Sequence, residues 1–344
     1  MASTTETARR LAPGLALATG IAVVATVIGR FLPVVGAPVS GVVLGAVIGM
    51  VRRPADSLKP GITTASKFVL QLAVVLLGAQ LSLAEVARVG VESLPVMLGT
   101  LVICLLAAWG VGRLLGVVGN LRTLIGVGTG ICGASAIAAV TPVIGAVSVE
   151  VAYAVSTIFL FNVAAVIVFP IVGHALGMSQ HAFGLFAGTA VNDTSSVVAA
   201  ASTYGTQAAN FAVVVKLVRT LMIIPIVLGL AWLVGRRSAA AVTVEGAAPT
   251  RWSLRRVWKL VPWFLTGFVI AAAVNSTGIL PGPVHPAIST VAAFLITVAL
   301  SAIGLSTDIA GFRRAGFRPL VLGLVLWVVV TGSSLGLMAL TGSL

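Results

Sequence analysis

Residues 188–200 read GTAVNDTSSVVAA, and they interrupt the apolar character of the chain at one defined place. Five consecutive polar side chains, at positions 192–196, stand between small residues and an apolar run. The sequence on both sides is apolar enough to require a membrane. Polar side chains at membrane depth are costly, and they mark functional sites. The stretch therefore predicts a membrane helix that is broken by glycine and polar residues at the site where the protein acts.

The composition points to the same class of protein. Hydrophobic residues make up 59% of the 344 residues and charged residues 8%, and the mean hydropathy is +1.15. A soluble domain of this length needs a more charged exterior, so we predict an all-α polytopic membrane protein. The chain has 21 Lys and Arg against 8 Asp and Glu. These cations lie between apolar runs, as membrane topology requires, so lipid rather than nucleic acid is the expected partner.

Apolar runs of about 17 to 25 residues predict about eleven transmembrane helices. The approximate limits are 12–30, 36–51, 62–83, 93–115, 123–145, 150–170, 183–201, 208–234, 259–277, 286–305 and 318–341. The fifth and seventh runs contain glycine and polar residues, which predicts broken helices. Residues 235–258 are predicted to form a basic cytoplasmic linker between the first eight helices and the last three. The whole chain, 1–344, is predicted to form a single membrane domain.

The distribution of Lys and Arg predicts the orientation. In an eleven-helix count, one face carries Arg9, Arg10, Arg52, Arg53, Lys59, Arg113, Arg122, Arg236, Arg237, Arg251, Arg255, Arg256, Lys259, Arg313, Arg314 and Arg318. The other face has Arg30 and Arg88 as its loop cations. Positively charged loops stay in the cytoplasm. We therefore expect a bacterial plasma membrane protein whose amino terminus is cytoplasmic and whose carboxyl terminus lies outside.

Two weak internal similarities suggest duplication. Residues 78–90, GAQLSLAEVARVG, resemble residues 304–316, GLSTDIAGFRRAG, and the two lie on opposite faces, as in an inverted repeat. Residues 128–139, GTGICGASAIAA, resemble residues 188–200, but the two run in the same direction in an eleven-helix count. Both similarities fit one duplication only if one of the predicted helices is re-entrant. Otherwise one of the two similarities is due to chance.

The two GT-containing stretches are candidates for a binding site. Broken backbone at membrane depth is tolerated where it lines a cavity, and the amino ends of half-helices attract anions. The residues predicted to hold a small anionic solute are Cys132, Gly133, Ala134, Ser135, Asn192, Thr194, Ser195 and Ser196. The alternative is close packing of helices through their small residues.

Two cations follow on the next helix. Lys216 and Arg219 are three residues apart and share one helix face. We predict that they supply positive charge to the solute, and that Asp193 pairs with them and takes part in ion coupling. One acid against two cations favours an anion as cargo. The alternative is a structural pair of Lys216 with Asp193 and an Arg219 side chain that reaches the membrane interface.

Four motifs in order resemble the YeiH-type sulfate exporter family. They are residues 128–146 (GTGICGASAIAAVTPVIGA), 188–205 (GTAVNDTSSVVAAASTYG, followed by VKLVR), 262–276 (PWFLTGFVIAAAVNS) and 299–323 (ALSAIGLSTDIAGFRRAGFRPLVLG). The resemblance runs from about Arg52 to the carboxyl terminus. It implies the inverted-repeat fold of cation:proton antiporters and bile-acid symporters, with crossing broken helices and elevator-type movement. Many members carry His where this chain has Asn192, so a titrating imidazole is absent at that position.

The resemblance implies export of sulfate or an organosulfonate, so we predict an ion-coupled secondary transporter of a small anion. The coupling ion is a proton or sodium, and a second copy of the chain is an open alternative as partner. A cation:proton antiporter on the same fold is the competing function, but it would need more acids within the helices than Asp193. We do not expect an enzyme, because the sequence shows no paired acids or serine–histidine arrangement within the helices. It also shows no metal-ligand or nucleotide-binding pattern, so no cofactor or metal is expected.

Overall fold

The computed structural model describes residues 4–31, 36–241, 263–306 and 317–344, and the regular elements in these ranges are all helical. The helices are α1 (Thr4–Phe31), α2 (Gly36–Val51), α3 (Lys59–Thr64), the π-helical turn η1 (Ala65–Val69), α4 (Leu70–Gly78), α5 (Leu83–Leu114), α6 (Gly119–Gly130), α7 (Ala134–Ile144), α8 (Ser148–Ala175), α9 (Gln180–Ala190), α10 (Thr194–Tyr204), α11 (Thr206–Leu221), α12 (Ile223–Ala241), α14 (Trp263–Ser276), the 3-10 turn η2 (Gly282–Val284), α15 (His285–Leu305) and α17 (Phe317–Leu340). The predicted linker begins at 235, but α12 continues to Ala241, and positions 242–258 lie outside the described residues.

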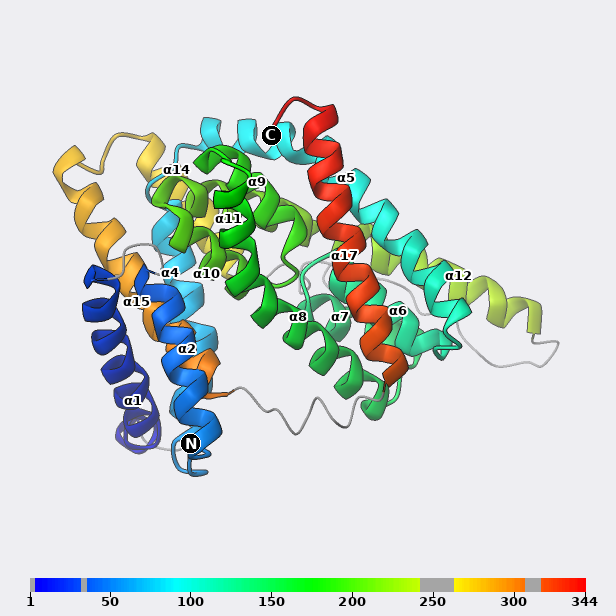
Figure 1. Cartoon of the computed structure of the whole chain (residues 1–344), viewed down its shortest axis with the longest axis horizontal. Helices are drawn as coiled ribbons and strands as arrows, with labels where there is room; N and C mark the ends of the chain where they lie inside the picture. The colour runs from blue at the N-terminus through cyan, green and yellow to red at the C-terminus, as the bar shows by residue number, and fades with distance from the viewer. Residues whose placement is uncertain (1–3, 32–35, 242–262, 307–316) are drawn as a thin grey trace.

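Two groups of helices lie on either side of a third group in the middle of the molecule. Figure 1 shows α1, α2, α4 and α15 at one end of the molecule and α6, α7 and α12 at the other, with α9, α10 and α11 between them. Seven segments of the described chain are long and apolar enough to cross a membrane. The protein is therefore an all-α membrane protein with several crossings, as the composition predicts.

Glycines set the close packing of the first group. Gly45 on α2 lies against the backbone carbonyl of Ser301 on α15, and Gly304 on α15 lies against the carbonyl of Val42. Any side chain at either glycine would meet backbone atoms, so the two helix axes approach closely only because Cβ atoms are missing. Gly41 and Gly45 contact successively later residues of α15, so α2 and α15 run in the same direction.

Contacts of α5 fix the directions of its neighbours. Gly112, near the end of α5, lies against Arg122 near the start of α6, and Gly130, at the end of α6, lies against Leu101 in the middle of α5. The helix α6 therefore runs antiparallel to α5 and stops halfway along it. The helix α17 also runs antiparallel to α5, because Gly99 lies against Leu337 and Gly112 against Leu322.

The path of α8 shows that α6 and α7 form a hairpin. Gly323 near the start of α17 lies against Thr157, and the Trp327 ring stacks on Phe169 at 5.3 Å between centroids. The helix α8 thus runs parallel to α17 and begins on the face where α5 ends. Because α7 leads directly into α8, it must return to the face from which α6 started. The pair α6–α7 is a re-entrant hairpin.

A second hairpin, α9–α10, enters from the opposite face. Gly184 lies against Phe211 and Gly188 against Val215, so α9 and α11 run in parallel. The start of α9 is close to the start of α11, because the Oε1 atom of Gln180 accepts a hydrogen bond from the backbone amide of Gln207 at 3.1 Å. The helix α10 between them must therefore run back toward the face where α9 begins.

These hairpins correct the predicted number of transmembrane helices. The fifth and seventh predicted transmembrane helices are broken, as expected, but they are re-entrant and do not cross. The described segments that run from one face toward the other are α1, α2, α3–α4, α5, α8, α11–α12, α14, α15 and α17. The second internal similarity was expected to run in one direction, and this was wrong: its two members, α6–α7 and α9–α10, enter from opposite faces. The first similarity includes residues 307–316, which lie outside the described residues.

The two hairpins change which face exposes two short loops, and this provides a test. A cysteine at Val147, before α8, is expected to react with an impermeant maleimide from the face that carries Arg113, since α7 returns there. A cysteine at Leu176, after α8, is expected to react from the other face. Both side chains are exposed, at 60% and 50%. Eleven crossing helices would give the reverse pattern for both positions. The native Cys104 and Cys132 are buried, and the parent protein serves as the unlabelled control.

Candidate functional site

The tips of the two hairpins meet in the middle of the protein. Residues 131–133 join α6 to α7, and residues 191–193 join α9 to α10. A Cβ atom placed on Gly133 would lie 3.0 Å from the Cβ atom of Asp193. The two broken segments that the sequence marked as separate candidates are thus brought into direct contact.

Neighbouring helices hold the second tip in place. On α8, the buried side-chain oxygen of Asn162 accepts hydrogen bonds from the backbone amides of Asn192 at 3.2 Å and Asp193 at 3.3 Å. On α17, the hydroxyl of Ser334 lies 2.7 Å from the hydroxyl of Thr189. Backbone amides at a helix break need partners when water is excluded. Asn162 supplies them for this tip.

Lys216 on α11 connects the two hairpins. Its Nζ atom donates to the carbonyl oxygens of Ile131 and Val191, each at 2.8 Å. One carbonyl follows the end of α6 and the other follows the end of α9. The side chain is 0% exposed. The ammonium therefore links the carboxyl ends of two half-helices that belong to different hairpins.

Arg219 makes the same connection one turn further along α11. Its Nε atom donates to the carbonyl of Gly130 at 2.6 Å, and Nη1 donates to the carbonyl of Thr189. This side chain is also 0% exposed. The carboxyl end of a helix carries about half a negative charge, and a cation there is favourable. Two cations thus face the two inward-facing carboxyl ends, and their positive charge exceeds the negative charge of those ends.

The predicted ion pair between Lys216 and Asp193 does not form. The Asp193 carboxylate instead caps α10: Oδ1 accepts from the backbone amide of Ser196 at 3.0 Å, and Oδ2 accepts from its hydroxyl at 2.8 Å. The lysine is drawn to carbonyls because helix ends inside the protein have no water to bind them. The Ser196 hydroxyl is occupied by this cap.

The amino end of α7 differs from that of α10. Its capping residue, Gly133, has φ +70° and ψ −129°, and it offers no side chain to the first amides of the helix. Ala134 and Ser135, the first two residues of α7, are exposed. The first amide groups of a helix have no partner within it and attract anions. At the meeting tips, this end of α7 has two exposed residues, and its N-cap residue provides no side-chain cap.

Two buried polar atoms near the tips have no partner within the described part of the chain: Nη2 of Arg219 and the side-chain oxygen of Asn192. No group of three or more metal-ligating residues occurs among the described residues. An amide inside an apolar helix, such as Asn162, can line a transport path or join helices. Its contacts with the tip favour the second role. Ser334 was not predicted as a site residue, because a single serine in an apolar helix forms no recognisable sequence pattern.

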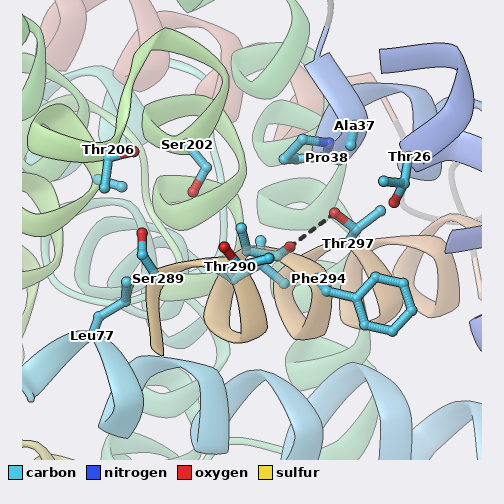
Figure 2. Close-up of a pocket in the computed structure, with 13 residues that line it drawn as sticks. Thr26, Ala37, Pro38, Leu77, Ser202, Thr206, Ser289, Thr290, Phe294 and Thr297 are labelled. Atoms are coloured by element: carbon cyan, nitrogen blue, oxygen red, sulfur yellow. Dashed lines mark hydrogen bonds between the residues drawn. The ribbon is translucent and has the colours of Figure 1, made fainter. Parts of the chain in front are cut away.

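A cavity of about 470 Å³ lies beside the carboxyl end of α10, which is the end away from the hairpin tip. Figure 2 shows Ser202 and Thr206 on one side and Ser289, Thr290 and Thr297 along α15 on the other. The hydroxyls of Thr290 and Thr297 donate to carbonyls of their own helix, at 2.9 Å each. Their oxygen atoms therefore face the cavity mainly as acceptors. None of the lining residues is charged.

The fold and the site define a polytopic membrane protein with two opposed re-entrant hairpins. The chain belongs to the family described as Conserved hypothetical protein 698, whose model matches residues 13–323. It is similar to a UPF0324 membrane protein of Streptococcus pyogenes, with 41% identity over 95% of this chain and 96% of the relative. UPF0324 membrane proteins of Streptococcus mutans (40% identity, 96% and 97% covered) and Fusobacterium nucleatum (39%, 96% and 98%) are also similar.

Proposed function

We propose that the protein is a secondary transporter of a small anion, which binds where the hairpin tips meet. One observation carries the proposal: Lys216 and Arg219 occupy the carbonyls at both inward carboxyl ends, while the N-cap residue of α7 provides no side-chain cap and the first two residues of α7 are exposed. The donors for the anion are the first amides of α7 and the hydroxyl of Ser135. Thr194 and Ser195, both partly buried, lie across from them at the start of α10.

The charges at the tips favour an anion of low charge. Each helix end carries about half a unit charge, so the two amino ends and two carboxyl ends sum to about zero. Two buried cations and one carboxylate then leave about +1. A univalent anion such as a sulfonate matches this charge, and a divalent oxyanion such as sulfate matches it with a bound proton. The competing antiporter is disfavoured, because Asp193 is the one carboxylate at the tips and it caps α10.

The proposed movement is alternating access with the basic face in the cytoplasm. Arg52, Arg53 and Arg113 are exposed on that face, where the positive-inside rule places them in the cytoplasm. The hydroxyl-lined cavity lies toward the other face, and we assign it as the vestibule on the outer side. Glycine contacts such as Gly45 with Ser301 make α2 and α15 a rigid pair against which the hairpins move. The hairpin arrangement and the sequence similarities together support an elevator-type inverted repeat.

Binding to the purified protein in detergent tests this proposal. A ligand at about 100 times its dissociation constant adds about 2.7 kcal/mol of stability. We expect inorganic sulfate or methanesulfonate to raise the unfolding temperature, and sodium chloride at equal ionic strength to leave it unchanged. If sodium alone stabilises the protein and no anion does, the competing cation antiporter is the correct function.

Ser135→Asp separates binding from stability. An acidic residue in the first turn of α7 stabilises the helix by about 0.3–1 kcal/mol. The same carboxylate occupies the anion position. The variant is therefore expected to lose the sulfate or methanesulfonate shift completely, while its unfolding temperature without ligand stays at or above that of the parent. Ser135→Asn has a similar shape without the charge and is the matched control. Retained anion binding in Ser135→Asp would place the site elsewhere.

A further inference from the structure

Lys216 and Arg219 hold the same two hairpins but differ in one chemical respect. The Lys216 ammonium donates to Ile131 and Val191, and the Arg219 guanidinium donates to Gly130 and Thr189. A guanidinium stays protonated in proteins, whereas a buried lysine amine can titrate. The pair therefore combines a permanent connection between the hairpins with one that can lose its charge.

We propose that Lys216 carries the coupling proton of the transporter, so that one anion and one proton bind together. This rests on the proposed function, since it names how the same site is coupled. Release breaks one Nζ–H bond: the electron pair stays on nitrogen, and the proton passes to water on the face to which the tips are open. The neutral amine keeps two N–H groups, but hydrogen bonds from an uncharged donor are about half as strong.

The loss of this charge acts on both the solute and the hairpins. The net charge at the tips falls from about +1 to about zero, because the helix ends and Asp193 are unchanged. The anion then loses the charge that holds it. The hydrogen bonds that Nζ donates to Ile131 and Val191 become about half as strong, which loosens the connection between the tips. Anion release and hairpin separation thus follow from one proton.

The other titratable groups around Lys216 fit this role less well. They are Cys104 on α5, Cys132 and Asp193 at the two tips, and Arg219 on α11. The helix α4 also packs against α11, but it has no titratable side chain. Both thiols are buried in apolar surroundings and are chemically inert there. Asp193 accepts two hydrogen bonds as the cap of α10, and its protonation would remove that cap. Lys216 is the group whose charge can change while the helix cap remains.

Proton uptake during anion binding provides the test. Binding coupled to proton uptake is reciprocal: if the anion prefers the protonated lysine, anion binding draws a proton from solution. The purified protein is mixed with methanesulfonate in weak buffer at several pH values, and the proton count is read with a pH dye. We expect up to one proton per bound anion in the parent, and an affinity that falls about tenfold per pH unit once the lysine loses its proton.

The variants distinguish this inference from the function on which it rests. Lys216→Arg keeps the charge but cannot titrate, so it is expected to bind methanesulfonate with no proton uptake and an affinity independent of pH. Lys216→Gln is a second non-titrating variant of smaller size, expected to show weak binding and no uptake. Lys67→Arg, at an exposed lysine, is the matched control and should behave as the parent. Proton uptake that persists in Lys216→Arg overturns the inference and points to Asp193. Absence of anion binding in the parent overturns the proposed function itself.

Discussion

Arg219→Met is expected to lower the free energy of unfolding by about 3 kcal/mol and to abolish transport. The variant removes two hydrogen bonds from a charged donor, to Gly130 and Thr189, and each such bond contributes about 1.5–3 kcal/mol. The carbonyls left behind lie at the inward carboxyl ends of α6 and α9, where no water replaces the guanidinium. Thermal unfolding in detergent and anion uptake into liposomes measure the two effects.

Two further variants show whether the hydrogen bonds cause the loss. Arg88 is exposed in α5, and Arg88→Met removes a cation of the same kind without a buried partner. It should change stability by less than about 0.5 kcal/mol. Arg219→Lys keeps the charge but not the forked donor geometry, so a partial recovery of stability is expected. If Arg219→Met unfolds at the same temperature as the parent, the hairpin tips do not depend on this side chain.

The two members of the second internal similarity show how far sequence reasoning reaches. Glycine and polar residues at 128–135 and 188–196 correctly predicted two broken helices. A hydropathy window, however, gives the same apolar length for a helix that crosses and for a hairpin that returns, so both were counted as crossings. Each hairpin removes one crossing from the predicted eleven, so the number of crossings stays odd. The termini therefore fall on opposite faces in either count. The direct contact of Gly133 with Asp193 depends on tertiary structure, and no local pattern contains it.

The predicted roles of the charged residues were harder to derive. The spacing of Lys216 and Arg219 predicted that they share one helix face, and both side chains reach the same two hairpins. Their role toward a solute stays a prediction. Their partners are backbone carbonyls, and a carbonyl has no signature in the sequence because every residue has one. Asp193 was therefore the one visible partner, although its position before Thr194, Ser195 and Ser196 is also typical of a helix cap. The capping pattern was the better guide, because the structure shows that cap.

Gly133→Ala is expected to leave the protein folded and to weaken anion binding by about tenfold or more. Gly133 has φ +70° and ψ −129°, a conformation that a residue with a Cβ atom adopts at a cost of order 1–3 kcal/mol. The added Cβ atom would also lie 3.0 Å from the Cβ atom of Asp193, so the two tips must move apart. Binding of methanesulfonate and the unfolding temperature are both measured.

Gly145→Ala separates the strain from the contact. Gly145 ends α7 with φ +65°, and a Cβ atom there would meet nothing within 4 Å. It should lower stability through backbone strain alone, by about 1–2 kcal/mol, and leave the anion affinity unchanged. A loss of binding in Gly133→Ala but not in Gly145→Ala assigns the effect to the spacing of the tips. An equal loss in both would mean that anion binding depends on the stability of α7 as a whole, and the meeting of the two hairpins would no longer explain the site.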